Sequence, residues 1–137
     1  MKKVMFISIL VVLLFACKKL EFEPEGPTDV RVRNVQNDYT FYEVVINTAG
    51  SRDTTGNIKT LGTIAPGEVS EYKRVAIAFS KAEITAKING ETFSTGPVNS
   101  TYMDYKGQMR ITYEVYISDM NNKVLTISDV IPDEPLP

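Results

Sequence analysis

The sequence AEITAKINGETF, residues 82–93, indicates the fold more clearly than any other stretch. In its first half, apolar residues alternate with polar ones, which is the period of a β-strand with one buried face. Asn89 and Gly90 follow, and both residue types tolerate the positive φ angles of a two-residue type I′ turn. We therefore predict a β-hairpin, with Ala86 opposite Phe93 on the buried face.

Alternation of the same kind predicts strands before this hairpin. Val30 and Val32 are expected to face the core, with the neighbouring arginines facing outward. Residues 39–48 carry β-forming residues on both faces, which is typical of a central strand or of one partly covered by a neighbour. The two faces are predicted to hold Tyr42, Val44 and Ile46 on one side, and Phe41 and Val45 on the other.

The C-terminal part of the chain predicts a second hairpin. Its first strand would place one set of side chains inward and another outward, namely Ile111, Tyr113, Val115 and Ile117 against Thr112, Glu114 and Tyr116. Residues 119–122 are expected to turn, and residues 124–131 to return as the second strand. Before this hairpin, residues 96–108 are predicted to form a long loop.

These segments together indicate the fold class. About seven short strands, with turn signals roughly every 8–12 residues and no convincing amphipathic helix, are typical of β-sandwiches. The sequence therefore predicts an all-β fold, a single antiparallel β-sandwich of the Ig-like or transthyretin-like kind, over residues 29–131. Residues 132–137 are acidic and rich in proline, and we expect them to form a disordered tail.

The N-terminus has the pattern of a secretory signal. Two lysines precede the apolar run Val4–Phe15, which ends at Ala16 and at Cys17, the only cysteine. The run is about half of the ~20 residues that a permanent membrane-spanning helix needs. Residues 1–16 are therefore predicted to be a signal peptide. The alternatives are a plain signal peptide cut nearby, which would leave Cys17 as a free thiol, and a buried core cysteine.

This start resembles a bacterial lipoprotein signal, although Phe15 is bulkier than the residue usual at its position. The resemblance implies that Cys17 becomes the first residue of the mature protein and carries a diacylglyceryl group, usually with a third acyl chain such as palmitate. Residues 17–28 would then be the lipidated cysteine and an extended tether. The resemblance also implies the bacterial cell envelope, and it favours the outer membrane because Lys18 stands where inner-membrane retention uses aspartate.

Charge and composition exclude several classes of function. Lys2 and Lys3 are two of the 15 basic residues, so the mature chain would carry 13 against 17 acidic residues, a net charge of about −4. Nucleic-acid binding, which needs a basic surface, is therefore not expected. The chain has no histidine, which removes the usual general base and the commonest zinc ligand, and it has no Gly-rich phosphate loop. We expect no enzymatic activity and no cofactor.

Four short motifs occur in the order found in small single-domain lipoproteins of the Bacteroidota. They are Ile46-Asn47-Thr48, Gly62-Thr63-Ile64, Gly67-x-x-Ser70-x-Tyr72 and Ile88-Asn89-Gly90. The chain resembles that group over most of residues 38–90. The resemblance implies a β-sandwich in the cell envelope, and it brings no catalytic residues with it.

The predicted 96–108 loop holds the best candidates for a binding site. Tyr102, Asp104 and Tyr105 lie close together in it, and tyrosine offers a large contact area at low entropic cost. Loops at the end of a β-sandwich are common binding sites, so these residues would contact a glycan or an envelope protein. The alternative is that the tyrosines fold back and cover the end of the core.

Several other polar residues could belong to a functional site, but each also has an ordinary structural explanation. Glu83, Asp104 and Glu114 could supply the two carboxylates of a glycosidase, but charges that alternate with apolar residues are ordinary on exposed strand faces. Asp53, or Asp119 with Asn121, has the oxygen ligands that calcium prefers, but turn chemistry explains these residues better, and no metal site is predicted. Arg31 and Arg33 could bind a carboxylate or phosphate, or could simply protect a sheet edge.

The hypothesis that these observations favour is a lipid-anchored, non-enzymatic binding or accessory module of the cell envelope. The membrane would be contacted through lipidated Cys17. The alternatives are a structural subunit of a surface assembly that adds strands edge to edge, and a carboxylate-based glycan hydrolase.

Overall fold

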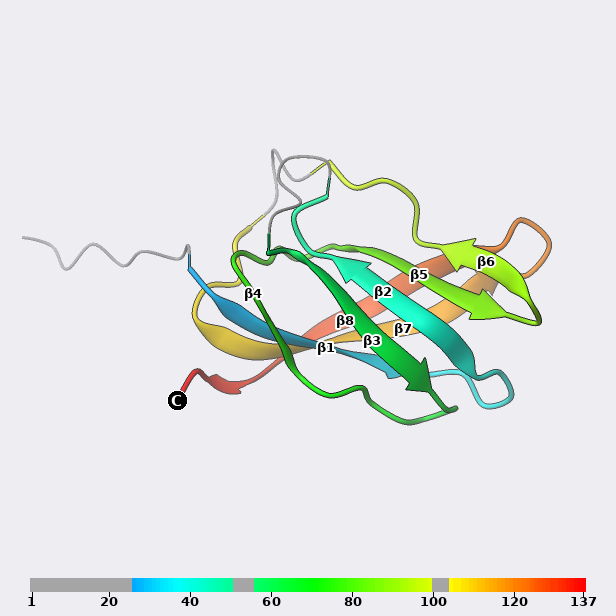
Figure 1. The fold of residues 1–137 in the computed structure, drawn as a ribbon, viewed down its shortest axis with the longest axis horizontal. Helices are drawn as coiled ribbons and strands as arrows, with labels where there is room; N and C mark the ends of the chain where they lie inside the picture. Colours follow the sequence, from blue (N-terminus) through cyan, green and yellow to red (C-terminus); the bar gives the residue numbers. More distant parts are fainter. Residues whose placement is uncertain (1–25, 51–55, 100–103) are drawn as a thin grey trace, which may run out of the picture.

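The computed structural model describes residues 26–50, 56–99 and 104–137, and all regular elements in these ranges are β-strands (Figure 1). The strands are β1 (Thr28–Asn34), β2 (Phe41–Asn47), β3 (Ile58–Ile64), β4 (Lys73–Val75), β5 (Glu83–Ile88), β6 (Glu91–Ser94), β7 (Met109–Asp119) and β8 (Val124–Pro135). The predicted all-β class is confirmed. Within these ranges no helix has the length and apolar character needed to cross a membrane.

The strands form one curled sheet in the order β3-β2-β5-β6-β8-β7-β1-β4. The end strands β3 and β4 lie in contact, so the sheet is nearly closed into a barrel, with β2, β3 and β5 in front of β1, β7 and β8 (Figure 1). Two neighbouring pairs, β1–β7 and β6–β8, are parallel. The sheet is therefore mixed, which differs from the purely antiparallel arrangement expected. Alternation along a strand shows which face is buried but carries no information on the direction of its neighbour.

Both predicted hairpins are present. Ala86 pairs with Phe93, and Asn89 and Gly90 have φ angles of 51° and 78°, as a type I′ turn requires. In the second hairpin, Tyr113 is among the largest fully buried side chains. The inward set Ile111, Tyr113 and Val115 is fully buried, and Ile117 packs partly against the same core. The hydrophobic core therefore lies inside the curled sheet.

The predicted faces of β2 are wrong at its start. Phe41 is fully buried and Tyr42 is 52% exposed, whereas Tyr42 was expected to share a face with Val44 and Ile46. The reason is a β-bulge: Glu43 has a φ of 46°, and the pairing of β2 shifts register on both sides of it. One extra residue reverses the face of everything before it.

The expected disordered tail is also wrong for most of its length. β8 continues to Pro135, and Pro132 and Pro135 pair with Ile111 and Met109 of β7. The acidic residues of this segment pair with basic residues on neighbouring strands. For example, Arg110 Nη1 lies 2.6 Å from Glu134 Oε1. At the other end, Thr28 belongs to β1 and not to the tether.

Tyr113 links β7 to the segment between β4 and β5 through a buried hydrogen bond. Its hydroxyl donates to the carbonyl oxygen of Phe79 at 2.6 Å, and the two residues are 34 positions apart. Burial raises the pKa of Tyr113 far above its usual value, so this hydroxyl keeps its proton and remains a donor.

We expect Tyr113→Phe to lower the free energy of unfolding by about 1–3 kcal/mol, because it leaves the buried Phe79 carbonyl without its partner. Chemical denaturation measures the change. Tyr42→Phe is the matched control, because Tyr42 is half exposed. Equal losses for the two variants would contradict the structural role assigned to Tyr113.

Candidate functional site

The predicted loop is only partly within the described residues. Asp104 is exposed, whereas the ring of Tyr105 packs on Phe79 with ring centroids 4.8 Å apart. The backbone confirms this attachment, since Tyr105 bridges to Phe79 and the Lys106 amide donates to the Ala78 carbonyl at 2.9 Å. Tyr105 therefore lies against the end of the core. Tyr102, like Cys17, lies outside the described residues, and a contact role for the loop stays a prediction.

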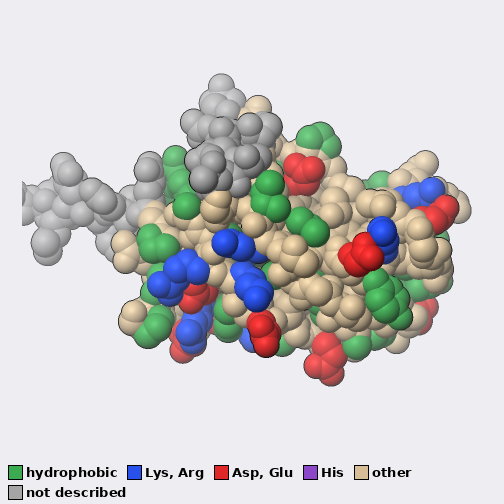
Figure 2. Space-filling view, in the orientation of Figure 1, with side chains coloured by type: hydrophobic (Ala, Val, Ile, Leu, Met, Phe, Trp, Pro, Cys, Tyr) green, Lys and Arg blue, Asp and Glu red, His purple; other side chains and the backbone are tan. Residues whose placement is uncertain are grey.

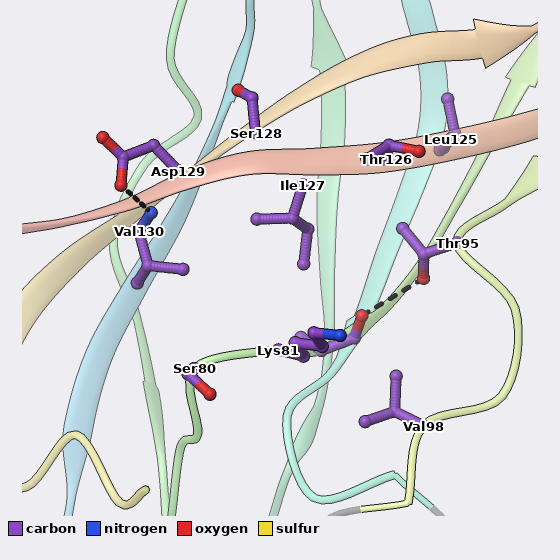
Figure 3. Close-up of a pocket in the computed structure, with 11 residues that line it drawn as sticks. Ser80, Lys81, Thr95, Val98, Leu125, Thr126, Ile127, Ser128, Asp129 and Val130 are labelled. Carbon is purple, nitrogen blue, oxygen red and sulfur yellow. Dashed lines mark hydrogen bonds between the residues drawn. The ribbon is translucent and has the colours of Figure 1, made fainter. Parts of the chain in front are cut away.

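A groove opens beside β8, next to the single residue pair, Ser94 and Val124, that joins β6 to β8 (Figure 3). Its volume is about 310 Å³. We call it the β8 groove, and it is lined by Ser80, Lys81, Ala82, Thr95, Val98 and residues 125–130. A second cavity of about 230 Å³ adjoins it through the shared residue Val130, and it is lined by Tyr105, Lys106, Met109, Ile111, Val130 and Pro132. Of the predicted 96–108 loop, Val98 lines the groove itself, whereas Tyr105 and Lys106 line the adjoining cavity.

The floor of the β8 groove is apolar. Leu125 is buried, and Ile127 and Val130 are half-buried and pack against the core. Figure 3 shows Ile127 and Val130 pointing from β8 toward the segment that carries Ser80 and Lys81. An extra residue in the pairing of β8 with β7 separates these two positions, so both still face inward.

The polar groups of the groove are engaged with the protein or exposed at its rim. Thr95 Oγ1 accepts a hydrogen bond from the Ile84 amide at 2.9 Å and donates one to the Ala82 carbonyl at 3.1 Å. Asp129 Oδ1 accepts from the Val130 amide at 2.8 Å. Lys81 and Asp129 are exposed, so one charge of each sign stands at the rim.

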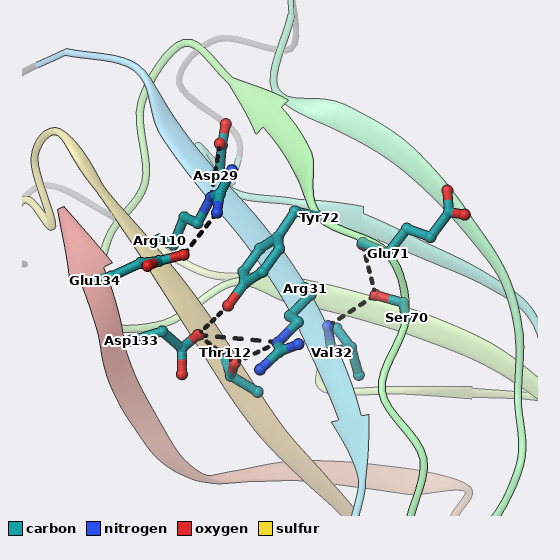
Figure 4. A network of polar contacts seen from close by, with 10 residues as sticks. All are labelled: Asp29, Arg31, Val32, Ser70, Glu71, Tyr72, Arg110, Thr112, Asp133 and Glu134. Carbon is teal, nitrogen blue, oxygen red and sulfur yellow. Dashed lines mark hydrogen bonds and ion pairs between the residues drawn. The ribbon is translucent and has the colours of Figure 1, made fainter. Parts of the chain in front are cut away.

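A polar cluster covers the outer face of β1, β7 and β8 around Tyr72 (Figure 4). The Tyr72 ring lies under two guanidinium groups, with Arg31 at 4.5 Å and Arg110 at 5.2 Å from its centroid. The hydroxyls of Tyr72 and Thr112 both donate to Asp133 Oδ2 at 2.6 Å. The predicted outward direction of Thr112 is correct, but the cluster buries it.

Charges in this cluster are largely balanced. The Arg74 and Arg110 side chains both contact Asp29, whose side chain is 10% exposed. Basic and acidic side chains are mixed on the neighbouring surface near β4, with no large patch of one sign in this view (Figure 2). Among the described side chains, the buried Nε of Arg33 has no hydrogen-bond partner. The cluster is therefore a set of structural contacts that ties β8 to β1 and β7.

The pKa shifts in the cluster follow from these contacts. The hydrogen bond from Arg74 lowers the pKa of Asp29, against the opposing effect of burial. Burial acts to raise the pKa of Asp133, but hydrogen bonds from Thr112 and Tyr72 outweigh it, and the pKa is lowered. Burial and the bond to Asp133 raise the pKa of Tyr72. Each shift stabilises the protonation state already present near neutral pH.

The other predicted polar residues are dispersed. Glu83 lies on β5 opposite Asn47, and Glu114 lies on β7 between Arg33 and Asp129. The oxygens of Asp119 accept hydrogen bonds from the backbone of Asn121 and Asn122, which is the turn chemistry that the sequence favoured. Within residues 26–50, 56–99 and 104–137, no three His, Cys, Asp or Glu side chains converge as a metal site would require. Asp53 lies outside the described residues.

Sequence reasoning did not find the β8 groove. Its walls come from three separate segments, 80–82, 95–98 and 125–130, and it lies where β6 leaves β8 after a single bridging pair. The alternation of Leu125 and Ile127 was visible in the sequence, but it indicated only a buried face.

No family model and no curated protein matches this chain. An NMR structure of a protein from Eubacterium rectale is similar with 17% identity and a TM-score of 0.46, covering 78% of this chain and 93% of that one. A crystal structure from Bacteroides ovatus ATCC 8483, described as a "putative cell adhesion protein", is similar with 11% identity and a TM-score of 0.44. That match covers 82% of this chain and 46% of the other, so this chain spans less than half of that protein.

We expect Asp29→Asn to destabilise the protein by about 1 kcal/mol or less near pH 7, because it weakens the bonds to Arg74 and Arg110. The pKa of Asp29 is lowered in the folded state. Its contribution is therefore present above the ordinary pKa of 3.8 and is lost as the pH falls through the lowered value.

Denaturation of both proteins between pH 7 and pH 3 should show the difference shrinking toward the acid end. Asp104→Asn, at an exposed position, is the control and should follow the wild type throughout. A difference for Asp29→Asn that stays constant over the whole range would show that its carboxylate charge does not act as described.

Proposed function

We propose that this protein is a lipid-anchored, non-enzymatic binding module of the bacterial cell envelope, and that it binds its ligand in the β8 groove. The observation that carries the proposal is a cavity of about 310 Å³ that opens at the surface and has an apolar floor with polar groups around it. Cavities of this size that combine apolar surface with polar groups at fixed positions are typical of ligand-binding sites.

The chemistry of the groove supports binding more than catalysis. Among its described lining residues, Asp129 is the one carboxylate, whereas the hydrolysis of a glycoside generally uses two on opposite sides of the bond. Thr95 Oγ1 is held by the Ile84 amide in β5 and the Ala82 carbonyl just before it, so its hydroxyl stabilises the groove wall. The predicted contact loop adds Tyr105 and Lys106 at the adjoining cavity, which would extend the binding surface beyond the groove.

The lipid anchor in the proposal comes from the sequence, since Cys17 follows an apolar run of signal-peptide length. Stable membrane attachment needs two or more acyl chains, which a lipoprotein cysteine would supply. The ten residues 18–27 would then reach at most ~35 Å between the anchor and β1. The groove would be held close to the membrane, where it would meet envelope proteins or glycans.

A second candidate function is a structural subunit that adds strands edge to edge. The observation that favours it is the side of β8 facing the groove, where pairing with β6 is limited to Ser94 and Val124. Assembly of this kind would give oligomers of the purified protein, which size-exclusion chromatography with light scattering detects.

We expect Cys17→Ser to move the protein from the membrane fraction to the soluble fraction of its native host. The wild type should remain with the membrane, and its N-terminal peptide should carry the mass of two or three acyl chains. Met120→Ser, at an exposed position in the β7–β8 turn, is the control and should stay membrane-bound. A wild-type protein with an unmodified Cys17 thiol, or with residues 1–16 still attached, would overturn the anchor.

A further inference from the structure

We propose that the turn at Asn89 and Gly90 is a site of spontaneous chemical modification, at which the side-chain amide of Asn89 is converted to a carboxylate. The co-reactant is water, and the product is aspartate or isoaspartate at position 89. This inference goes beyond the proposed binding function, and it depends neither on the β8 groove nor on the lipid anchor.

The turn leaves both reacting groups accessible. Asn89 and Gly90 are exposed, and they connect Ile88 to Glu91, the last pair in the ladder between β5 and β6 (Figure 1). Among the described residues, neither the Asn89 side chain nor the Gly90 amide takes part in a hydrogen bond. A Cβ at Gly90 would meet no atom within 4 Å. Segments with so few contacts open locally at a small free-energy cost, which lets the two groups approach each other.

The reaction needs only base and water. When base removes the proton of the Gly90 amide, the nitrogen attacks Cγ of the Asn89 side chain. A bond forms between these two atoms, the bond from Cγ to the side-chain nitrogen breaks, and that nitrogen takes up a proton and leaves as ammonia. The product is a succinimide ring. Water then opens the ring at Cγ, which gives aspartate, or at the backbone carbonyl carbon, which gives isoaspartate.

The residue that follows distinguishes Asn89 from the other seven asparagines. Asn89 alone precedes a glycine, which has no side chain to hinder the approach of its nitrogen. Four of the others have side-chain amides that are hydrogen-bonded within the protein, namely Asn34, Asn47, Asn57 and Asn122. The remaining three precede aspartate, serine or asparagine, and they are Asn37, Asn99 and Asn121. We therefore expect Asn89 to react first.

The two products differ in their effect on the hairpin. Aspartate suits a type I′ turn as asparagine does, so it should leave the hairpin intact. Isoaspartate carries the backbone through the former side chain, which lengthens the turn by an additional backbone carbon. The register that places Ala86 opposite Phe93 depends on the length of this turn. Isoaspartate should therefore disturb β6, including buried Phe93 and the Ser94–Val124 pair that joins β6 to β8.

The test ages the purified mature chain in mildly alkaline buffer at physiological temperature. Peptide mass spectrometry locates each amide that has become a carboxylate, and labelling by an isoaspartyl methyltransferase measures isoaspartate. We expect conversion at Asn89 to be about tenfold faster than at any other asparagine, because glycine alone leaves the attacking nitrogen unhindered. The rate should rise with pH, since the deprotonated amide is the nucleophile.

The variant Asn89→Gly should not age at this turn, because it lacks the side-chain amide and Gly-Gly also suits a type I′ turn. The isoaspartate form of the wild type should unfold at a temperature lower by about 4 °C or more, whereas aged Asn89→Gly should keep its midpoint. Fresh Asn89→Asp represents the other product and should unfold as the fresh wild type does. Asn121→Ser, at an exposed position in the β7–β8 turn, is the matched control and should age as the wild type does.

Conversion at Asn37, Asn99 or Asn121 that equals the conversion at Asn89 would overturn the assigned site. An aged Asn89→Gly protein that loses as much thermal stability as the aged wild type would overturn the assigned consequence. If Asn89→Gly does not fold, anion-exchange chromatography can separate the modified and unmodified fractions of one aged wild-type sample. Equal unfolding temperatures for the isoaspartate fraction and the unmodified fraction would then overturn it in the same way.

Discussion

The continuity of the curled sheet depends on a single backbone pairing, between Ser94 of β6 and Val124 of β8, which joins its two halves in the strand order. Phe93 and Leu125, each next to a residue of this pair, are buried in the same core. Because no further pair follows it, the strands separate and leave the β8 groove. The joint between the two halves of the sheet and the groove therefore lie side by side.

The edge of β8 is held in place from its other side. Its long pairing with β7 continues into the polar cluster, where Asp133 accepts hydrogen bonds from Tyr72 and Thr112. Exposed ion pairs such as Arg110–Glu134 contribute little individually, but the half-buried bonds to Asp133 fix the strand end in one geometry. A strand edge that is already ordered loses little entropy when a ligand binds, which favours its use as a binding surface.

The proposed function joins two features that are independent of each other. The N-terminal pattern ending at Cys17 would place the domain at a membrane, and the groove would determine what it contacts there. The predicted loop would take part through Tyr105, which packs on Phe79 and lines the second cavity beside the β8 groove. A tether of about ten residues would keep the groove within a short distance of other envelope proteins.

The sequence by itself determined the all-β class and both hairpins, because alternation and the Asn89-Gly90 turn are local properties that need no distant partner. It did not determine the face of Tyr42, since the bulge at Glu43 is fixed by pairing with β3 and β5. The extension of β8 to Pro135 depends on contacts such as the one between Glu134 and Arg110, two residues that are 24 positions apart in the chain. The groove was decided by tertiary structure alone, because its lining comes from the separate segments 80–82, 95–98 and 125–130, which only the folded chain brings together.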